Sequence, residues 1–450
     1  MSDRIRTYLA GSLLLLALAA AVVVRFAALE RAPAGFYIDE AAIAAQALCI
    51  AHSGHSAQGK AWPLYADVLG GGQASPILLY PAAAWSKLGN DSIAGLRTLS
   101  VGLGLVMLAT IVWAASGHQH WWLHAGLGLL CLSNPWWFSA TRIFWDPVFG
   151  AACWGLGLAL YWRCRQLPTA SWWYSCRLCL VSILLVSAAY AYPPVRIQLL
   201  LSLVLVAFWD TSALVQVRWA LAPPMLLGGA LLSPLIMEYL LSGSFAGRGQ
   251  MLAVWNADWM QSQGLSAWDL PGVALRNVWL HLDPAYLWLQ GDSNLRHSTG
   301  FGGLLGPAEA SIIIATALLA PRILCSRNSG LLLALSIAGV LPAALTWEGL
   351  PHALRSLGAT GPLLLWICVI GAQLHQRLAI DQRRRLLLLL CVISSLGLLR
   401  FGQHYFHSFA QQSQDWFGGQ VAPADYSDEF ALARLYYELR SGQADCPASP

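Results

Sequence analysis

The run LAGSLLLLALAAAVVVRFAAL at residues 9–29 decides the fold class of this chain. As a helix it is long enough to cross about 30 Å of hydrocarbon, and it is too long for the core of a signal peptide. In lipid, a helix satisfies its backbone hydrogen bonds internally. We therefore predict an uncleaved first membrane-spanning helix.

Similar apolar runs recur along all 450 residues, of which 57% are hydrophobic and only 11% are charged. This composition, with a mean hydropathy of +0.55, excludes an ordinary soluble domain. We predict an all-α, polytopic integral membrane protein with about eleven spanning helices. Residues 1–400 form the membrane domain and residues 401–450 a short external tail. After the first span, the predicted spans are 96–115, 122–138, 145–162, 177–191, 195–209, 219–241, 305–321, 330–346, 357–375 and 386–400.

Arginines in the short loops fix the orientation, because basic residues next to spans are retained on the cytoplasmic side. With the amino terminus inside, the cytoplasmic loops carry most of these arginines. Three long polar segments then lie outside: 30–95, 242–304 and the tail. Long segments on one face indicate an extracytoplasmic site. The cytoplasmic arginines are Arg163, Arg165, Arg218, Arg322, Arg327, Arg377, Arg383, Arg384 and Arg385.

Within the first external segment, Ile77–Leu88 is apolar but short for a span. We interpret it as a helix lying along the membrane interface, and a twelfth span is the alternative. Cys49 and Cys446 both fall outside, where they could pair, but the sequence does not decide this. The net charge of +4 is small and dispersed, so no nucleic-acid partner is expected.

Two external positions carry carboxylates suited to acid–base chemistry. Asp39 and Glu40 follow the first span, where an acidic helix cap is the structural alternative to catalysis. Asp146 opens a later span, four residues after Arg142. An ion pair that pins the turn and a functional carboxylate are equally open interpretations of Asp146.

External turns also carry cations that could bind an anion. Two of these turns place an arginine near a histidine, which suits a phosphate whose lipid tail lies in the membrane. Contacts with lipid headgroups or loop salt bridges are the alternative. The candidates for the phosphate are Arg296, His297, His352 and Arg355, and the other site candidates are Arg142, Tyr192 and Arg196.

The order of these elements, from Arg25 to Leu374, resembles the GT-C superfamily of membrane glycosyltransferases. The likeness is to glycosyltransferase family 39 and the protein-mannosyltransferase-like bacterial branch that includes the lipid A aminoarabinose transferases. The matching pieces are Asp39-Glu40, Gly59-Lys60-Ala61-Trp62-Pro63, Ser75-Pro76 to Tyr80, Leu88-Gly89 to Leu96-Arg97, Thr141-Arg142 with Asp146, Tyr192 with Arg196, Arg296-His297-Ser298, and Pro351-His352 with Arg355.

The resemblance implies a sugar donor built on polyprenyl phosphate, inversion at the anomeric carbon, and an active site on the outer face of the bacterial inner membrane. The acceptor would be a lipid, a glycan or a protein. Asp39 matches the catalytic base, with Glu40 beside it. Asp146 matches the second acidic position, where many relatives have a longer Glu. The residues expected to hold the donor phosphate are Arg296, His297, His352 and Arg355.

No cofactor is required by these patterns. There is no glycine-rich phosphate loop after a strand, and a lipid-linked donor needs none. Some GT-C enzymes use a divalent cation, but we see no ligand cluster in the sequence that demands one. Two other functions remain open: a multi-pass transporter or lipid flippase, and an inactive relative that scaffolds envelope assembly. A transporter would place its functional charges in the middle of spans.

Overall fold

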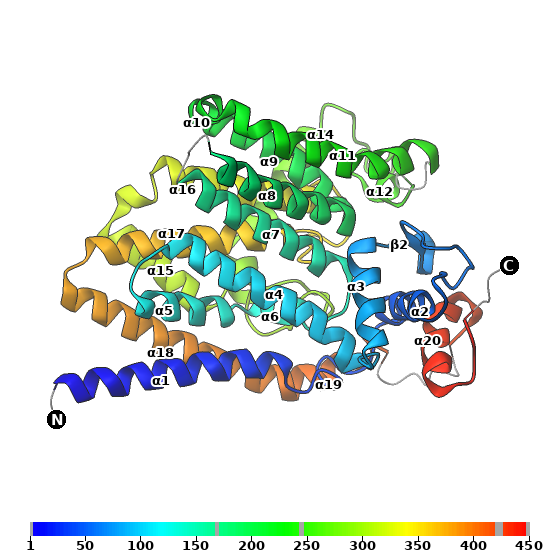
Figure 1. The fold of residues 1–450 in the computed structure, drawn as a ribbon, viewed down its shortest axis with the longest axis horizontal. Coiled ribbons are helices and arrows are strands. Elements are labelled where there is room, and N and C mark those ends of the chain that lie inside the picture. The colour runs from blue at the N-terminus through cyan, green and yellow to red at the C-terminus, as the bar shows by residue number, and fades with distance from the viewer. Residues whose placement is uncertain (1–2, 167–170, 243–246, 419–425, 447–450) are drawn as a thin grey trace.

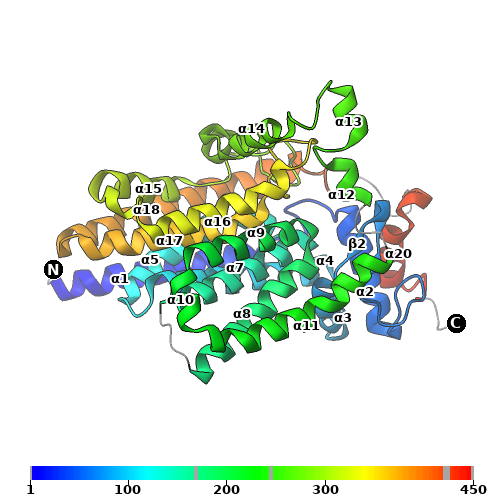
Figure 2. The same cartoon turned by 90° about the horizontal axis from the view of Figure 1, so that it is seen from above.

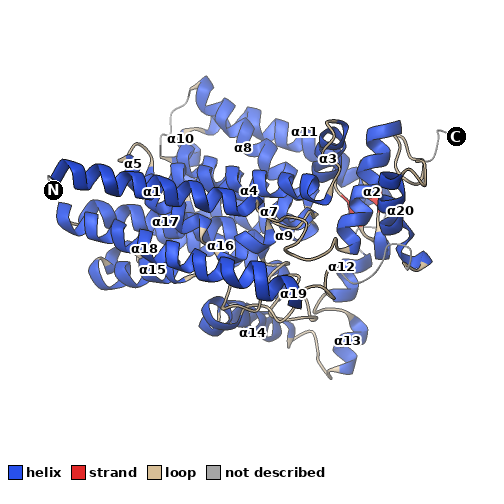
Figure 3. Ribbon diagram, turned by 90° about the horizontal axis from the view of Figure 1, so that it is seen from below, coloured by secondary structure: helices blue, strands red, loops and turns tan. Residues whose placement is uncertain are grey.

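The computed structural model describes residues 3–166, 171–242, 247–418 and 426–446. In these ranges the regular structure is almost entirely helical (Figure 3). One antiparallel pair of two-residue strands is present, β1 (Ala66–Asp67) with β2 (Gln73–Ala74). The all-α prediction is confirmed. The helices are α1 Asp3–Phe26, α2 Ile38–Ser53, α3 Pro76–Lys87, α4 Ile93–Ser116, α5 Trp121–Leu132, α6 Pro135–Ala140, α7 Asp146–Arg165, α8 Trp172–Ala191, α9 Pro193–Trp209, α10 Thr211–Gln216, α11 Arg218–Ser242, α12 Gly247–Leu252, α13 Ala257–Ser262, α14 Leu270–Leu282, α15 Pro307–Leu319, α16 Arg327–Ala344, α17 Thr360–Arg377, α18 Ile380–His404, α19 Ala410–Gln412 and α20 Ala431–Ser441.

The long helices run side by side along the long axis of the molecule (Figure 1). Helix α7 packs against α4, α8 and α17, and α16 packs against α9 and α17. Where α7 crosses α17, a Cβ added to Gly361 would lie 2.8 Å from the Gly155 Cα. Small residues allow such close approach between helices in lipid, where van der Waals packing drives association.

Six described helices are long and apolar enough to cross a membrane: α4, α8, α11, α16, a helix from Leu357 to Arg377 that includes α17, and a helix that begins with α18. Four shorter apolar helices lie at Gly11–Phe26, Trp121–Leu132, Pro193–Trp209 and Pro307–Leu319. Every predicted span except 122–138 overlaps one helix of the bundle. The total of about eleven spans stays a prediction.

One predicted span is interrupted. The sequence predicts a span over 122–138, but α5 ends at Leu132 and α6 begins at Pro135. Asn134 causes the break, because its side chain accepts a 2.8 Å hydrogen bond from the Trp137 amide and caps a new helix. Pro135 at the first position of α6 favours the same start.

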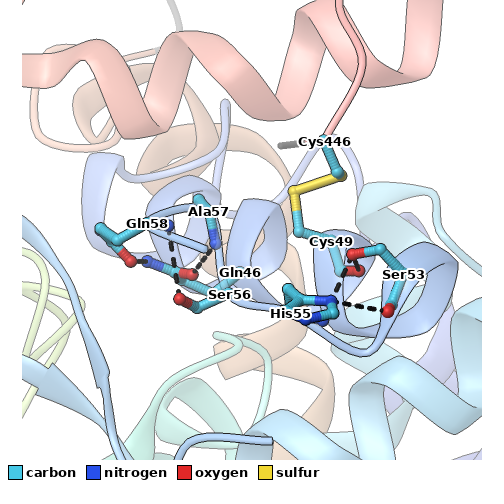
Figure 4. The surroundings of a disulfide bond; sticks show 8 residues. All are labelled: Gln46, Cys49, Ser53, His55, Ser56, Ala57, Gln58 and Cys446. Carbon is cyan, nitrogen blue, oxygen red and sulfur yellow. Dashed lines mark hydrogen bonds between the residues drawn. A yellow bond between two sulfur atoms is a disulfide. The ribbon is translucent and has the colours of Figure 1, made fainter. Parts of the chain in front are cut away.

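Helices α2 and α3 lie across one end of the bundle, and α20 lies beside α2 (Figure 1 and Figure 2). The twelve residues of α3 and this orientation favour the interfacial interpretation over a twelfth span. Cys49 of α2 forms a disulfide with Cys446 after α20, which answers the pairing left open by the sequence (Figure 4). The tail is therefore fixed to the helix that carries Asp39.

Candidate functional site

Asp39 lies in the first turn of α2, at the end of the bundle where α3 also lies. Its side chain is half-buried and interacts electrostatically with Asp146 at the start of α7. The structure thus brings together two carboxylates that are 107 positions apart in the chain. An acidic residue in the first turn of a helix also interacts favourably with the helix dipole.

Glu40, the next residue, is fully buried in an ion pair with Arg97 of α4. The Arg97 Nη2 donates to Glu40 Oε2 at 2.8 Å, and its Nε donates to Oε1 at 3.0 Å. The backbone amides of Tyr37 and Phe144 donate to the same carboxylate at 3.1 Å and 2.7 Å. With both oxygens occupied in this way, the geometry favours a positioning role over the catalytic role predicted for Glu40.

Asp146 is held by Ser75, the residue that precedes α3. The Ser75 hydroxyl donates to Asp146 Oδ1 at 2.6 Å, and the Ser75 amide donates to the same oxygen at 3.3 Å. Asp146 therefore links the starts of α3 and α7, close to Asp39.

Arg142 does not supply the ion pair with Asp146 that the sequence left open. It is buried, and its guanidinium donates to backbone carbonyls at the end of α1: Arg25 at 2.7 Å, Ala27 at 2.6 Å and Ala32 at 2.8 Å. These bonds satisfy the donors of a buried arginine without an anion. Arg142 thus shapes the chain segment that leads to Asp39, and its geometry favours a structural role.

Arg196 of α9 is connected to Asp146 indirectly, because both interact with Tyr65. The Arg196 Nη2 donates to the Tyr65 hydroxyl at 3.4 Å, and Tyr65 interacts electrostatically with Asp146. Burial raises the pKa of Tyr65, so its phenol stays protonated. The other predicted residue of this turn, Tyr192, sits between α8 and α9, where its Cβ lies in close contact with Gly150 of α7.

Arg296 reaches the start of α2 from the loop between α14 and α15. Its guanidinium hydrogen-bonds the Tyr37 hydroxyl and lies 4.8 Å from the centre of that ring. It also lies 5.5 Å from the centre of the Trp416 ring. Arg296 therefore contacts Tyr37, which precedes Asp39 by two positions, in an aromatic setting that stabilises positive charge.

His297 and His352 stack on each other, with ring centres 4.4 Å apart. Asp292 lies beside them, and its Oδ2 is 3.2 Å from His297 Nδ1. Burial lowers the pKa of His297, and it lowers that of His352 to about 2. Both imidazoles are therefore neutral at physiological pH, so neither brings a positive charge to a phosphate.

Among the residues that the structure describes, Asp292, His297 and His352 form a group that could hold a metal ion, because one ligand atom of each lies within 4.8 Å of the others. The sequence did not reveal this cluster. Asp292 and His297 share a loop, but His352 lies in another loop, and no local pattern encodes the pairing of two loops.

Arg355 has a different environment from the other predicted phosphate ligands. Its Nη1 donates to the Thr346 hydroxyl at 3.0 Å and to the Glu348 carbonyl at 2.9 Å, and its Nη2 lies 3.5 Å from Glu348 Oε2. The sequence also missed Tyr37 and Tyr65, because single tyrosines near membrane ends are common interfacial residues.

Fold and site together define a polytopic α-helical membrane protein with paired carboxylates and nearby cations at one end of its bundle. No family model and no curated protein matches this sequence. Solved structures do match in fold. The chain aligns with ArnT from Cupriavidus metallidurans in the apo state at 14% identity, covering 95% of this chain and 77% of ArnT, with a TM-score of 0.53.

The same protein bound to undecaprenyl phosphate gives a TM-score of 0.51 at 14% identity, with the same coverage. An oligosaccharyltransferase from Archaeoglobus fulgidus, tethered to an acceptor peptide, gives 0.51 at 10% identity, covering 94% of this chain and 58% of that one. ArnT is a lipid A aminoarabinose transferase, and both neighbours are GT-C glycosyltransferases. The chain therefore has the GT-C fold, as the order of its sequence elements predicts.

Proposed function

We propose that this protein is a membrane glycosyltransferase that moves a sugar from a polyprenyl-phosphate donor to an extracytoplasmic lipid, glycan or protein. The observation that carries the proposal is the position of Asp39, in the first turn of the helix that follows α1 in a GT-C fold, in electrostatic contact with Asp146. The likeness to a structure that binds undecaprenyl phosphate supports the donor class.

In the proposed reaction, Asp39 accepts the proton of the acceptor hydroxyl as its oxygen attacks the anomeric carbon. The bond from that carbon to the donor phosphate breaks on the opposite face, so the configuration inverts. Arg296 is the best-placed cation for the negative charge that develops on the leaving phosphate. Asp146 orients the site through its hydrogen bond with Ser75.

We also propose that this end of the bundle faces the extracytoplasmic side of a bacterial inner membrane. The Cys49–Cys446 disulfide supports this, because such bonds form and persist in oxidising compartments. The predicted cytoplasmic arginines support it too. Arg163 and Arg165 close α7 at the end opposite Asp146, and Arg377 closes α17.

Transfer of radiolabelled sugar from a panel of polyprenyl-phosphate sugars tests the proposal, using purified protein and envelope lipids. Asp39→Asn should lower transfer by about 100- to 10,000-fold, as expected for loss of a general base. Asp67→Asn is the matched control, because Asp67 is an exposed carboxylate of the same segment, paired with Lys60. It should retain normal transfer.

Wild-type turnover in the Asp39→Asn variant would remove Asp39 from the mechanism. If every donor and acceptor fails with the wild-type protein, the glycosyltransferase proposal falls. The transporter, flippase and scaffold alternatives would then be tested by substrate binding and by lipid translocation in vesicles.

A further inference from the structure

We infer that Asp292, His297 and His352 form a binding site for a transition-metal ion of the zinc type. Two imidazoles and one carboxylate are the protein ligands of many zinc sites that keep a fourth position open. One ligand atom of each residue lies within 4.8 Å of the other two. Asp292 and His352 are buried, and His297 is nearly so.

The distance between two of the ligand atoms fits tetrahedral coordination. Zinc bonds of about 2.0–2.1 Å place neighbouring ligand atoms roughly 3.3 Å apart. His297 Nδ1 and Asp292 Oδ2 are 3.2 Å apart. The rings of His297 and His352 are stacked, and one ligand atom of His352 lies within 4.8 Å of the ligand atoms of His297 and Asp292. A small rotation of the two rings would direct one nitrogen of each toward a shared ion.

The ligands are held by hydrogen bonds that do not involve an ion: one joins the two loops, one lies within the first loop, and one ties the second loop to α14. Asp292 Oδ2 accepts a 2.8 Å hydrogen bond from the Ala353 amide, and its Oδ1 accepts one of 2.9 Å from the Asn294 amide. His281 Nε2 accepts a 3.0 Å bond from the His352 amide. The ligands are thus held in place before any ion binds, which lowers the entropic cost of binding.

A second observation points to a ligand at this place. The ring centre of Trp145 lies 6.2 Å from that of His297, and Trp145 is only 5% exposed. Its Nε1 is buried and has no hydrogen-bond partner among the residues that the structure describes. A buried donor without a partner is costly. A water molecule or an anion bound near His297 would provide an acceptor for this donor.

The ligand set selects the kind of ion. Imidazole nitrogen suits zinc and similar transition metals, whereas magnesium and calcium prefer shells made of oxygen. With two nitrogens and one carboxylate, the site should bind Zn²⁺ and reject Mg²⁺. The role of the ion rests on the proposed function: beside Arg296 it would add positive charge for the phosphate of the donor.

The test is metal binding by the purified full-length protein after removal of bound metals with a chelator. Calorimetry with ZnCl₂ and elemental analysis should find one zinc per chain, unchanged by millimolar Mg²⁺. His297→Gln and His352→Gln should each weaken zinc binding by roughly 100-fold or more, since even indirect partners of ligands cost 10- to 100-fold. His404→Gln is the matched control, because His404 is a half-buried histidine that contacts Thr299 outside the cluster.

Cobalt provides a measurement on the wild-type protein that does not depend on how the variants fold. Co²⁺ in a tetrahedral nitrogen and oxygen site should give visible absorption that Zn²⁺ displaces. The Cys49–Cys446 disulfide, seen as a shift on a non-reducing gel, reports whether each variant has folded.

Absence of stoichiometric zinc binding, or equal binding by folded His297→Gln and His352→Gln variants, would overturn the inference and leave a hydrogen-bonded cluster only. The binding assay contains no sugar donor, so it is independent of the transfer assay. Asp39→Asn should bind zinc like the wild-type protein. Zinc binding in a protein that transfers no sugar would keep the metal site and reject the proposed glycosyltransferase.

Discussion

At the scale of single residues, the ion pair between Glu40 and Arg97 has no surface exposed to solvent. Arg97 also donates to the carbonyls of Leu29, Pro33 and Gly35 at 2.6 Å, 3.1 Å and 2.9 Å. This arginine therefore fixes the whole connection between α1 and α2. The orientation of Asp39 depends on that connection.

Arg97→Met should destabilise the protein by about 3–5 kcal/mol, because it leaves a buried carboxylate without its partner. The double variant Glu40→Gln with Arg97→Met should recover part of this loss, since the unpaired charge is gone. Thermal unfolding in detergent measures both. The control is Asp67→Asn, which breaks an exposed pair and should cost at most about 1 kcal/mol. If Arg97→Met and Asp67→Asn unfolded at the same temperature, the assigned role of Arg97 would be contradicted.

Some residues of the candidate site can be predicted from the sequence, and others cannot. Asp39 and Asp146 could be proposed as site residues because each follows or opens an apolar run. Tyr65 and Asp292 could not be proposed from the sequence, because their hydrogen-bond partners, Arg196 and Ala353, lie in distant parts of the chain. The burial of Glu40 was equally hidden, since adjacent acidic residues look alike in a sequence.

At the scale of elements, hydropathy predicted the helices well because lipid leaves the backbone few alternatives to helix. The prediction failed at Asn134, where a polar side chain capped a new helix inside an apolar region. Local capping chemistry therefore overrode the length of the apolar run. The close crossing of α7 and α17 could not be predicted, because glycines alone do not identify their partner.

Gly361→Ala tests that crossing. The new methyl group would lie 2.8 Å from the Gly155 Cα, so the helices must separate, at a cost of about 1–3 kcal/mol. Gly102→Ala in α4 is the matched control, because nothing lies within 4 Å of its added Cβ. There the better helix propensity of alanine should leave stability equal or higher. The unfolding temperature should fall in the Gly361→Ala variant and stay equal or rise in the Gly102→Ala variant. A similar change in unfolding temperature in both variants would exclude tight packing at Gly361.

At the scale of the whole molecule, the polar ends of the bundle differ in chemistry. Arginines close α7 and α17 at one end, whereas the carboxylates, the histidine cluster and the disulfide lie at the other. The orientation in the membrane is the prediction that belongs to this scale.

Lys60→Cys should react with a membrane-impermeant thiol reagent in intact cells, because Lys60 lies exposed in the predicted external segment. Cys325 is the internal control: it is exposed in the structure but falls in a predicted cytoplasmic loop, so it should react only after the cells are permeabilised. If position 60 were protected and Cys325 were labelled in intact cells, the predicted orientation would be wrong and the protein would lie the opposite way round in the membrane.

The disulfide between Cys49 and Cys446 has a consequence for the order of biosynthesis. It joins residues 397 positions apart, one in α2 and the other beyond α18 and α20. The bond can form only after α18 and the segment behind it have been synthesised. A chain that stalls in the membrane therefore keeps a reduced, unclamped α2. Oxidation at the carboxyl-terminal segment would therefore lock α2 only after the intervening helices have been synthesised.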